Sequence, residues 1–263
     1  MPVLTDPFGR PLPLHPAPRR IVSLVPSQTE LLHDLGLGDE VAGITKFCIH
    51  PDSWFRSKPR VGGTKTVHPD RVDALQPDLI LANKEENVRE QVEALAERYP
   101  TWVSDISTLN DALQMIRTVG ALVHRAGAAD ALAMQIGAAF AGLGTHSGPL
   151  LRTGYLIWKD PYMTVGADSF IHEMLGYLGV ANVFADKRRY PEMSPEDLSA
   201  CELLLLSSEP YPFAQKHIDE LQRDLPGTRI LLVDGEAFSW YGSRLLYTPA
   251  YFLKLRQQIA AMG

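Results

Sequence analysis

Short apolar runs alternate with amphipathic stretches along most of the chain, which is the pattern of parallel α/β folds. In the first half, a capping box formed by Ser27 and Glu30 is expected at the start of the first helix. The expected strands cover 21–25, 41–45, 78–82 and 101–103, and the expected helices cover 28–35, 69–75 and 88–98.

The pattern changes between residues 109 and 143, where the chain is rich in alanine and has no strand signal. Gly127 is expected to divide this stretch into two helices, and the second, 128–143, is a candidate rigid connector. The α/β alternation then resumes, with strands expected at 150–158, 203–207 and 230–233 and helices at 169–178, 214–224 and 248–261.

The two halves carry similar boundary signals. Pro69-Asp70 starts a helix that leads to an apolar strand, and Pro195-Glu196 does the same later in the chain. We therefore predict an N-terminal α/β lobe at 1–125, a connecting helix at 126–144 and a C-terminal α/β lobe at 145–263. The alternative is that these signals do not indicate a repeat, because any two α/β units share them.

Composition excludes several classes of protein. The formal net charge is -6, so the chain lacks the clustered basic residues of a nucleic-acid-binding domain. No apolar run approaches the roughly 18 residues that a membrane span requires. Residues 1–20 lack the apolar core of a secretory signal, which leaves a cytoplasmic protein or one whose leader was trimmed.

Known catalytic and metal-binding signatures are missing from the sequence. The stretch Gly62–Lys65 lacks the spacing of a phosphate-binding loop. Cys48 and His50 are weak metal candidates, because structural zinc usually takes more ligands than two. Cys201, at the edge of an apolar run, is expected to be buried. We predict a chain that is not an enzyme and that has no intrinsic cofactor or metal.

Aromatic and charged residues gather in the loops that follow the predicted strands. Ligands of parallel sheets bind beyond the carboxyl ends of the strands, so these loops are the candidate ligand site. The alternative is ordinary packing for the aromatic residues and a solvated surface for the charged ones. The candidates are Lys46, Phe47, Cys48, Lys65, Glu85, Trp158, Tyr162, Glu209, Tyr211, Trp240, Tyr241 and Arg244.

Three segments resemble a known family. The segment 20–32, RIVSLVPSQTELL, resembles the opening of the substrate-binding proteins of ABC importers for vitamin B12 and ferric siderophores. The segment 72–82, VDALQPDLILA, resembles the next signature of that family, and 164–184 resembles the start of its second lobe. The resemblance covers almost the whole chain.

The resemblance implies a fold and a function. The fold is two Rossmann-like α/β lobes joined by a single long connecting helix, known as the class III periplasmic binding fold. The ligand is expected to be cobalamin or a related metal chelate held between the lobes. The partner is expected to be an ABC permease dimer outside the cytoplasm, docked through Asp70 and Glu196, and the protein is expected to be a monomer.

Other functions remain open at this point. One is the binding of a metal ion, a ferric siderophore or heme, and another is a cytoplasmic ligand sensor or α/β enzyme. Lys65 and the loop 83–86 stand where the resemblance leads us to expect aromatic residues. These charges favour a ligand that carries carboxylates or amines.

Overall fold

The computed structural model describes residues 4–12, 16–144 and 149–262, and the chain divides into two compact units. The first unit takes Met1–Ile106, Asn110–Ile136 and Tyr241–Arg244, and the second takes Ser107–Leu109, Gly137–Trp240 and Leu245–Gly263.

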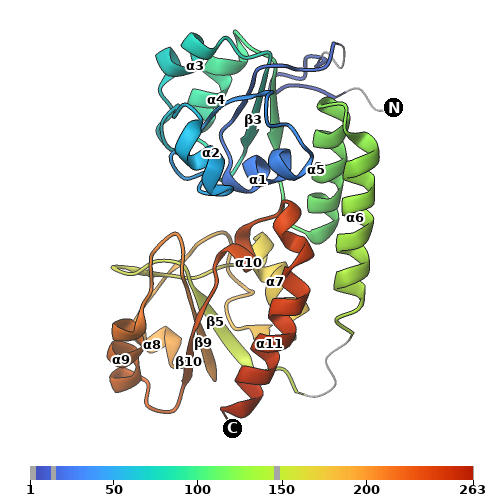
Figure 1. Cartoon of the computed structure of the whole chain (residues 1–263). Helices are drawn as coiled ribbons and strands as arrows, with labels where there is room; N and C mark the ends of the chain where they lie inside the picture. The colour runs from blue at the N-terminus through green and yellow to red at the C-terminus, as the bar shows by residue number, and fades with distance from the viewer. Residues whose placement is uncertain (1–3, 13–15, 145–148, 263) are drawn as a thin grey trace. The chain divides into compact units, whose positions relative to one another are not determined.

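The first unit is built on a parallel sheet with the strand order β2-β1-β3-β4 (Figure 1). Its strands are β1 (Ile21–Ser23), β2 (Val41–Ile44), β3 (Leu79–Asn83) and β4 (Thr101–Ser104). Its helices are α1 (Pro26–Asp34), α2 (Asp52–Ser57), α3 (Pro69–Leu75) and α4 (Arg89–Ala96), followed by α5 (Leu109–Leu122) and α6 (Ala126–Ala141).

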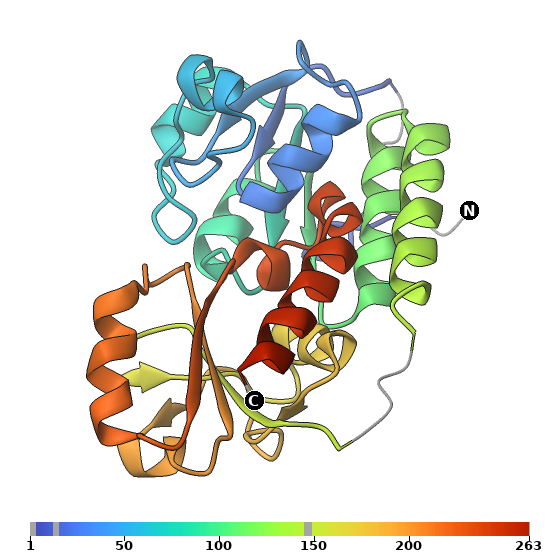
Figure 2. The same cartoon turned by 60° about the horizontal axis from the view of Figure 1, so that its bottom comes forward.

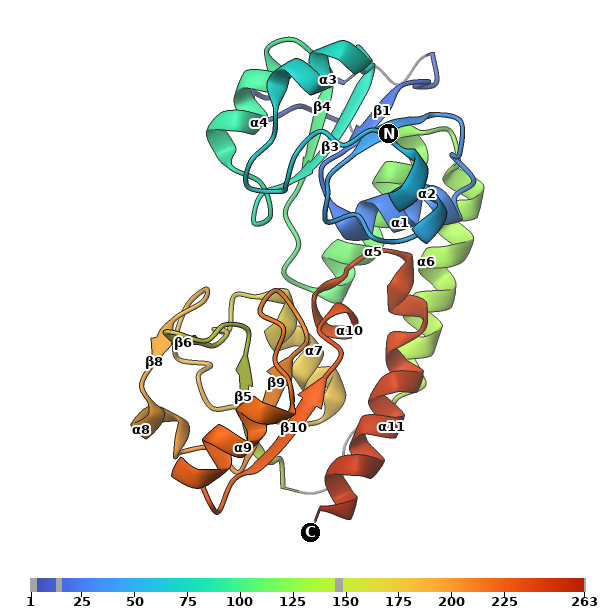
Figure 3. The same ribbon diagram turned by 60° about the vertical axis from the view of Figure 1, so that its left-hand side comes forward.

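Helices cover both faces of this sheet, which explains why its central strands are almost wholly apolar. Val22 and Ile80 pack with Val72 of α3 and Val92 of α4. Helices α1 and α5 lie on the other face (Figure 3). Helices α5 and α6 run side by side, and a Cβ on Gly120 would lie 2.2 Å from that of Ala129 (Figures 1 and 2).

The second unit is built on another parallel sheet, with the order β10-β9-β5-β7, and an antiparallel pair β6-β8. The strands are β5 (Arg152–Leu156), β6 (Tyr162–Met163), β7 (Ala181–Asn182), β8 (Glu192–Met193), β9 (Leu203–Ser207) and β10 (Arg229–Val233). The helices are α7 (Phe170–Leu178), α8 (Pro195–Leu198), α9 (Gln215–Asp224), α10 (Glu236–Ser239), the 3-10 turn η1 (Ser243–Leu246) and α11 (Thr248–Ala261).

Apolar side chains alternate between the two faces of this second sheet. Leu204 and Leu206 pack with Leu221 of α9 on one face. On the other face, the Tyr155 ring lies 4.9 Å from the ring of Phe238, which lies 4.9 Å from the ring of Phe252 in α11. The layers therefore follow from the period of two along each strand.

The two sheets have the same topology. In each, the first strand along the chain lies between the second and the third, and the fourth lies beyond the third. In both, the helix that precedes the third strand begins with proline, at Pro69 and at Pro195. The expected fold class, two α/β units connected through one long helix, is confirmed.

Two local predictions were wrong. Ser27 does not cap α1, because Pro26 takes the first helical position and Val25 precedes it. The Ala-rich stretch breaks at His124, which has a φ of 56°, and not at Gly127, which lies inside α6.

The expected lobe boundaries stay predictions. The connector α6 passes from the first compact unit to the second after Ile136, within the predicted connecting segment. The sequence pattern did not indicate that Tyr241–Arg244 returns to the first unit. Within the part of the chain that the structure describes, every helix is too short or too polar to cross a bilayer.

Candidate functional site

Lys46 and Phe47 project from the loop that follows β2. The Phe47 side chain is 50% exposed, and the Lys46 Nζ lies 5.0 Å from the centre of its ring. Both side chains lie over Gly63, where a Cβ atom would be 3.1 Å from Phe47 Cε2 and 3.3 Å from Lys46 Cε. Because residue 63 is a glycine, the side chains of Phe47 and Lys46 have room to lie over its backbone while they stay exposed.

The turn that carries Lys65 is held by side-chain amides. Asn87 Nδ2 donates to the carbonyl of Thr64 at 3.0 Å, and Gln91 Nε2 donates to the carbonyl of Lys65 at 3.2 Å. Gln91 Oε1 also accepts from the Val67 backbone N–H at 2.9 Å. The Lys65 ammonium donates to the carbonyl of Glu85. The loop after β3 and the start of α4 are thus bonded to this turn.

Cys48 is buried beneath the same loops. Its Sγ lies 3.1 Å from the Thr29 hydroxyl and 3.2 Å from that of Thr45, and the side chain has no exposed surface. Burial raises the pKa of the Cys48 thiol, although both threonine contacts lower it. Cys48 therefore behaves as a structural thiol. The described residues contain no cluster of three metal-ligating side chains.

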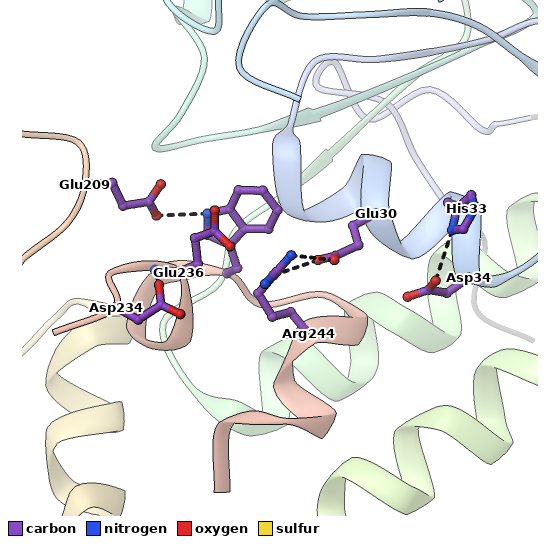
Figure 4. Close-up of polar contacts among 8 residues, drawn as sticks. Glu30, His33, Asp34, Glu209, Asp234, Glu236 and Arg244 are labelled. Atoms are coloured by element: carbon purple, nitrogen blue, oxygen red, sulfur yellow. Dashed lines mark hydrogen bonds and ion pairs between the residues drawn. The ribbon is translucent and has the colours of Figure 1, made fainter. Parts of the chain in front are cut away.

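Arg244 forms a two-pronged ion pair with Glu30 of α1 (Figure 4). Arg244 Nη2 lies 2.6 Å from Glu30 Oε1, and Nε lies 2.9 Å from Oε2. Burial raises the pKa of Glu30, while the hydrogen bonds and charge of Arg244 lower it. The guanidinium of this ligand-site candidate therefore binds a carboxylate of the protein itself.

Trp240 and Tyr241 are neighbours in sequence, and each donates to a glutamate that follows a strand. Tyr241 Oη donates to Glu86 Oε1 at 2.5 Å within the first unit. Trp240 Nε1 donates to Glu209 Oε1 at 2.9 Å within the second unit. Both aromatic side chains are buried, at 6% exposed. Glu86 and Glu209 both lie in the loop that follows the third strand of their sheet.

Glu209 also accepts from the Ser239 hydroxyl at 2.6 Å. Burial raises the pKa of Glu209, and the nearby carboxylates of Glu236 and Asp234 raise it further, while the bonds from Ser239 and Trp240 lower it. Figure 4 shows Asp234 and Glu236 in the segment after β10.

A glutamate with a raised pKa makes stability fall as pH rises. From its ordinary value of 4.5 up to the raised value, the folded chain keeps a proton that the unfolded chain releases. We expect Glu209→Gln to remove this loss, so that the stability of the variant relative to wild type, measured by urea unfolding, rises as the pH is raised above the ordinary value of 4.5.

Glu220→Gln is the matched control, because the hydrogen bond from Lys159 lowers the pKa of Glu220. This variant should become less stable than wild type above the ordinary pKa, the opposite trend. A gain for Glu209→Gln that is the same at every pH would contradict the assignment.

Trp158, Tyr162 and Tyr211 lie together in the second unit. The Trp158 side chain is 41% exposed, and its ring centre lies 5.6 Å from that of Tyr211, edge to face. Tyr162 begins β6 and is half-buried against the apolar core. The Tyr211 hydroxyl lies 3.3 Å from His217 Nε2, which fixes the orientation of the ring.

The structure groups the predicted residues within each unit. Ligand contact stays a prediction for all of them, and Phe47 and Trp158 are the aromatic candidates with large exposed faces. The grouping in the first unit comprises Lys46, Phe47, Cys48, Lys65, Glu85, Tyr241 and Arg244, and that in the second comprises Trp158, Tyr162, Glu209, Tyr211 and Trp240.

Sequence reasoning missed the roles of Glu30, Glu86 and Gly63. Glu30 was interpreted as a helix-capping residue, and Glu86 as part of the charged loop 83–86 that favours a ligand with carboxylates or amines. Their partners lie 214 and 155 residues away along the chain, so local pattern carried no signal for either pair.

These features define an α/β binding protein with exposed aromatic faces. The chain belongs to the periplasmic binding protein family, whose model matches residues 21–224. The members and neighbours of this family are substrate-binding proteins, which confirms that the chain is not an enzyme.

Curated relatives are similar over most of the chain. An ABC transporter substrate-binding lipoprotein of Bacillus subtilis strain 168 is 27% identical over 73% of this chain. That match spans 64% of the lipoprotein, which is less than two thirds of its length. A vitamin B12-binding protein of Pectobacterium carotovorum is 24% identical over 87% of this chain and 85% of the relative.

Solved structures share the fold. The periplasmic heme-binding protein RhuT from Roseiflexus sp. RS-1 has a TM-score of 0.79 at 21% identity, covering 91% of this chain and 98% of that one. The vitamin B12-binding protein BtuF of Vibrio cholerae has a TM-score of 0.74 at 20% identity, covering 92% and 98%.

Proposed function

We propose that this chain is the substrate-binding component of an ABC importer and that its cargo is a metal chelate with a flat macrocycle. The observation that carries the proposal is the exposure of Phe47 and Trp158 at the carboxyl ends of their sheets, in a chain of the periplasmic binding protein family. Exposed aromatic faces bind planar ligands by stacking. The same role places the protein outside the cytoplasm.

The relatives support this class of cargo. One is named for vitamin B12 and one structural neighbour for heme, and both of these compounds are metal-centred macrocycles. The identities are low, so they do not choose between these chelates. A bare metal ion is a weaker candidate, because the described residues bring no ligand cluster together.

Mass spectrometry of the compound retained on purified protein is the direct test. The native protein should carry a metal chelate, and the ligand-free protein should bind cobalamin or hemin with a change in the visible absorption spectrum. A retained metal ion without a chelator, or turnover of a retained metabolite, would contradict the proposal.

Permease docking is proposed for Asp70 and Glu196. Both are exposed acids in the first turn of a helix that begins with proline, α3 in the first unit and α8 in the second. Helix starts favour acids in any case, by about 0.3 to 1 kcal/mol, so position alone does not prove a partner. The equivalent placement in two units of the same topology supports a two-fold partner.

Reversing both charges should abolish uptake without changing ligand affinity. Asp70→Lys with Glu196→Lys converts attraction to basic permease residues into repulsion of several kcal/mol. The measurement is ligand uptake by vesicles that contain the permease.

The matched control is Glu90→Lys with Asp219→Lys, which changes net charge equally at other exposed helix positions. Equal uptake by the two double variants, or normal uptake by the Asp70 and Glu196 variant, would remove these acids from the interface.

A further inference from the structure

The first unit presents two ammonium groups and an aromatic face on one rigid surface. Lys46 and Phe47 lie over Gly63, and the Lys46 backbone N–H donates to the carbonyl of Gly62 at 2.8 Å. Lys65 lies in the same turn, which the Gly63 N–H closes by donating to the carbonyl of Thr66 at 2.8 Å. We call Lys46, Phe47, Gly63 and Lys65 the Lys–Phe surface.

The structure gives neither lysine of this surface a carboxylate partner among the residues it describes. The Lys65 ammonium donates to a backbone carbonyl, and Lys46 lies beside the Phe47 ring. Two carboxylates of the same unit have other partners. Glu30 binds Arg244, and Glu86 accepts from Tyr241.

Hydrogen bonds hold the backbone turn that carries Lys65 in one position. Asn87, which supports the turn through Thr64, also donates to the Leu24 carbonyl at 3.3 Å and accepts from the Asn83 N–H at 2.8 Å through Oδ1. The turn is therefore tied to the ends of β1 and β3. Fixed charges lose less entropy when they bind an anion than charges on a mobile loop.

We infer that the Lys–Phe surface selects a macrocycle that carries peripheral carboxylates, with the flat face of the ligand on Phe47 and the carboxylates on Lys46 and Lys65. This ligand class depends on the proposed function as a chelate carrier. Carboxylates form charge-assisted hydrogen bonds with ammonium groups. The peripheral amide side chains of a corrinoid are neutral and would form only uncharged acceptors for the two lysines.

The test compares hemin with hemin dimethyl ester, which has the same macrocycle but no free carboxylate. Wild type should bind hemin at least about tenfold more tightly than the ester. Lys46→Gln with Lys65→Gln should remove most of that preference and leave affinity for the ester nearly unchanged. Raising the salt concentration should reduce the preference in wild type, because salt screens exposed charges.

Two further variants separate charge from stacking. Lys254→Gln, an exposed lysine of α11 in the second unit, should leave both affinities unchanged. Phe47→Ala should lower the affinity for hemin and the affinity for its ester by the same factor, about tenfold. The ring contact that is lost does not involve the carboxylates.

The outcomes distinguish failure of the inference about the ligand class from failure of the proposed carrier function. Equal binding of hemin and its ester by wild type, or a preference that survives the double lysine variant, would overturn the inference while leaving the carrier function intact. Tighter binding of cyanocobalamin than of hemin would also overturn it. Failure of wild type to bind hemin, its ester and cyanocobalamin would instead contradict the proposed function.

Discussion

Arg244→Ala is expected to lower the free energy of unfolding by about 2 to 3 kcal/mol. The substitution leaves the Glu30 carboxylate, only 17% exposed, without the guanidinium that binds both of its oxygens. Uncompensated charge in a mostly buried place is costly, and the remaining exposure keeps the effect below that of a fully buried pair. Urea unfolding at neutral pH measures the loss.

A double-mutant cycle with Glu30→Gln isolates the pair. The double variant should be more stable than the sum of the two single losses predicts, because neither partner is left charged and alone. Arg89→Ala is the surface control, since Arg89 is 83% exposed in its pair with Glu93 and should cost less than about 0.5 kcal/mol. If Arg244→Ala and Arg89→Ala lowered the free energy of unfolding equally, the ion pair between Arg244 and Glu30 would be a solvated one.

Trp240→Ala should lower the free energy of unfolding by about 3 to 5 kcal/mol, because it empties a space occupied by a large side chain that is 6% exposed. The change also removes the indole N–H that donates to Glu209. The measurement is again urea unfolding, with far-UV circular dichroism to establish that the variant folds.

Trp240→Phe retains most of the apolar volume and removes only the indole hydrogen bond. Its cost should be about 1 kcal/mol, because Ser239 still donates to the same oxygen of Glu209. If Trp240→Ala left stability unchanged but abolished ligand binding, Trp240 would be a ligand anchor and not a packing residue.

Local sequence patterns predicted most of the fold because the longer strands are mostly compact apolar runs and most of the longer helices have boundary signals of their own. Helix α3 begins at Pro69 and α11 spans Thr248–Ala261, as the pattern predicts. The pair β6-β8 was missed, because strands of two residues are too short to show a period. Helix α2 was missed for a similar reason, since its six residues give less than two turns.

The candidate site was less predictable, since burial and pairing depend on contacts between distant segments. Their positions in loops after strands made Phe47 and Trp240 equal candidates for ligand contact. The Phe47 ring is half exposed, however, and the Trp240 ring is buried. Arg244 was a candidate for ligand contact from its loop position, and the local pattern did not indicate that Glu30 of α1 binds its guanidinium. Composition could not reveal that Cys48 is enclosed by the hydroxyls of Thr29 and Thr45.

The return of Tyr241–Arg244 to the first unit has a consequence for the order of events during synthesis. Arg244 follows its partner Glu30 by 214 residues, and Tyr241 follows Glu86 by 155. The sheet of the first unit can form as soon as its strands leave the ribosome, but Glu30 and Glu86 gain these two contacts only after residues 241–244 have been made. A nascent chain that stops before residue 241 therefore lacks the Tyr241 and Arg244 side chains that bind Glu86 and Glu30, and completion of the first unit depends on the synthesis of this segment.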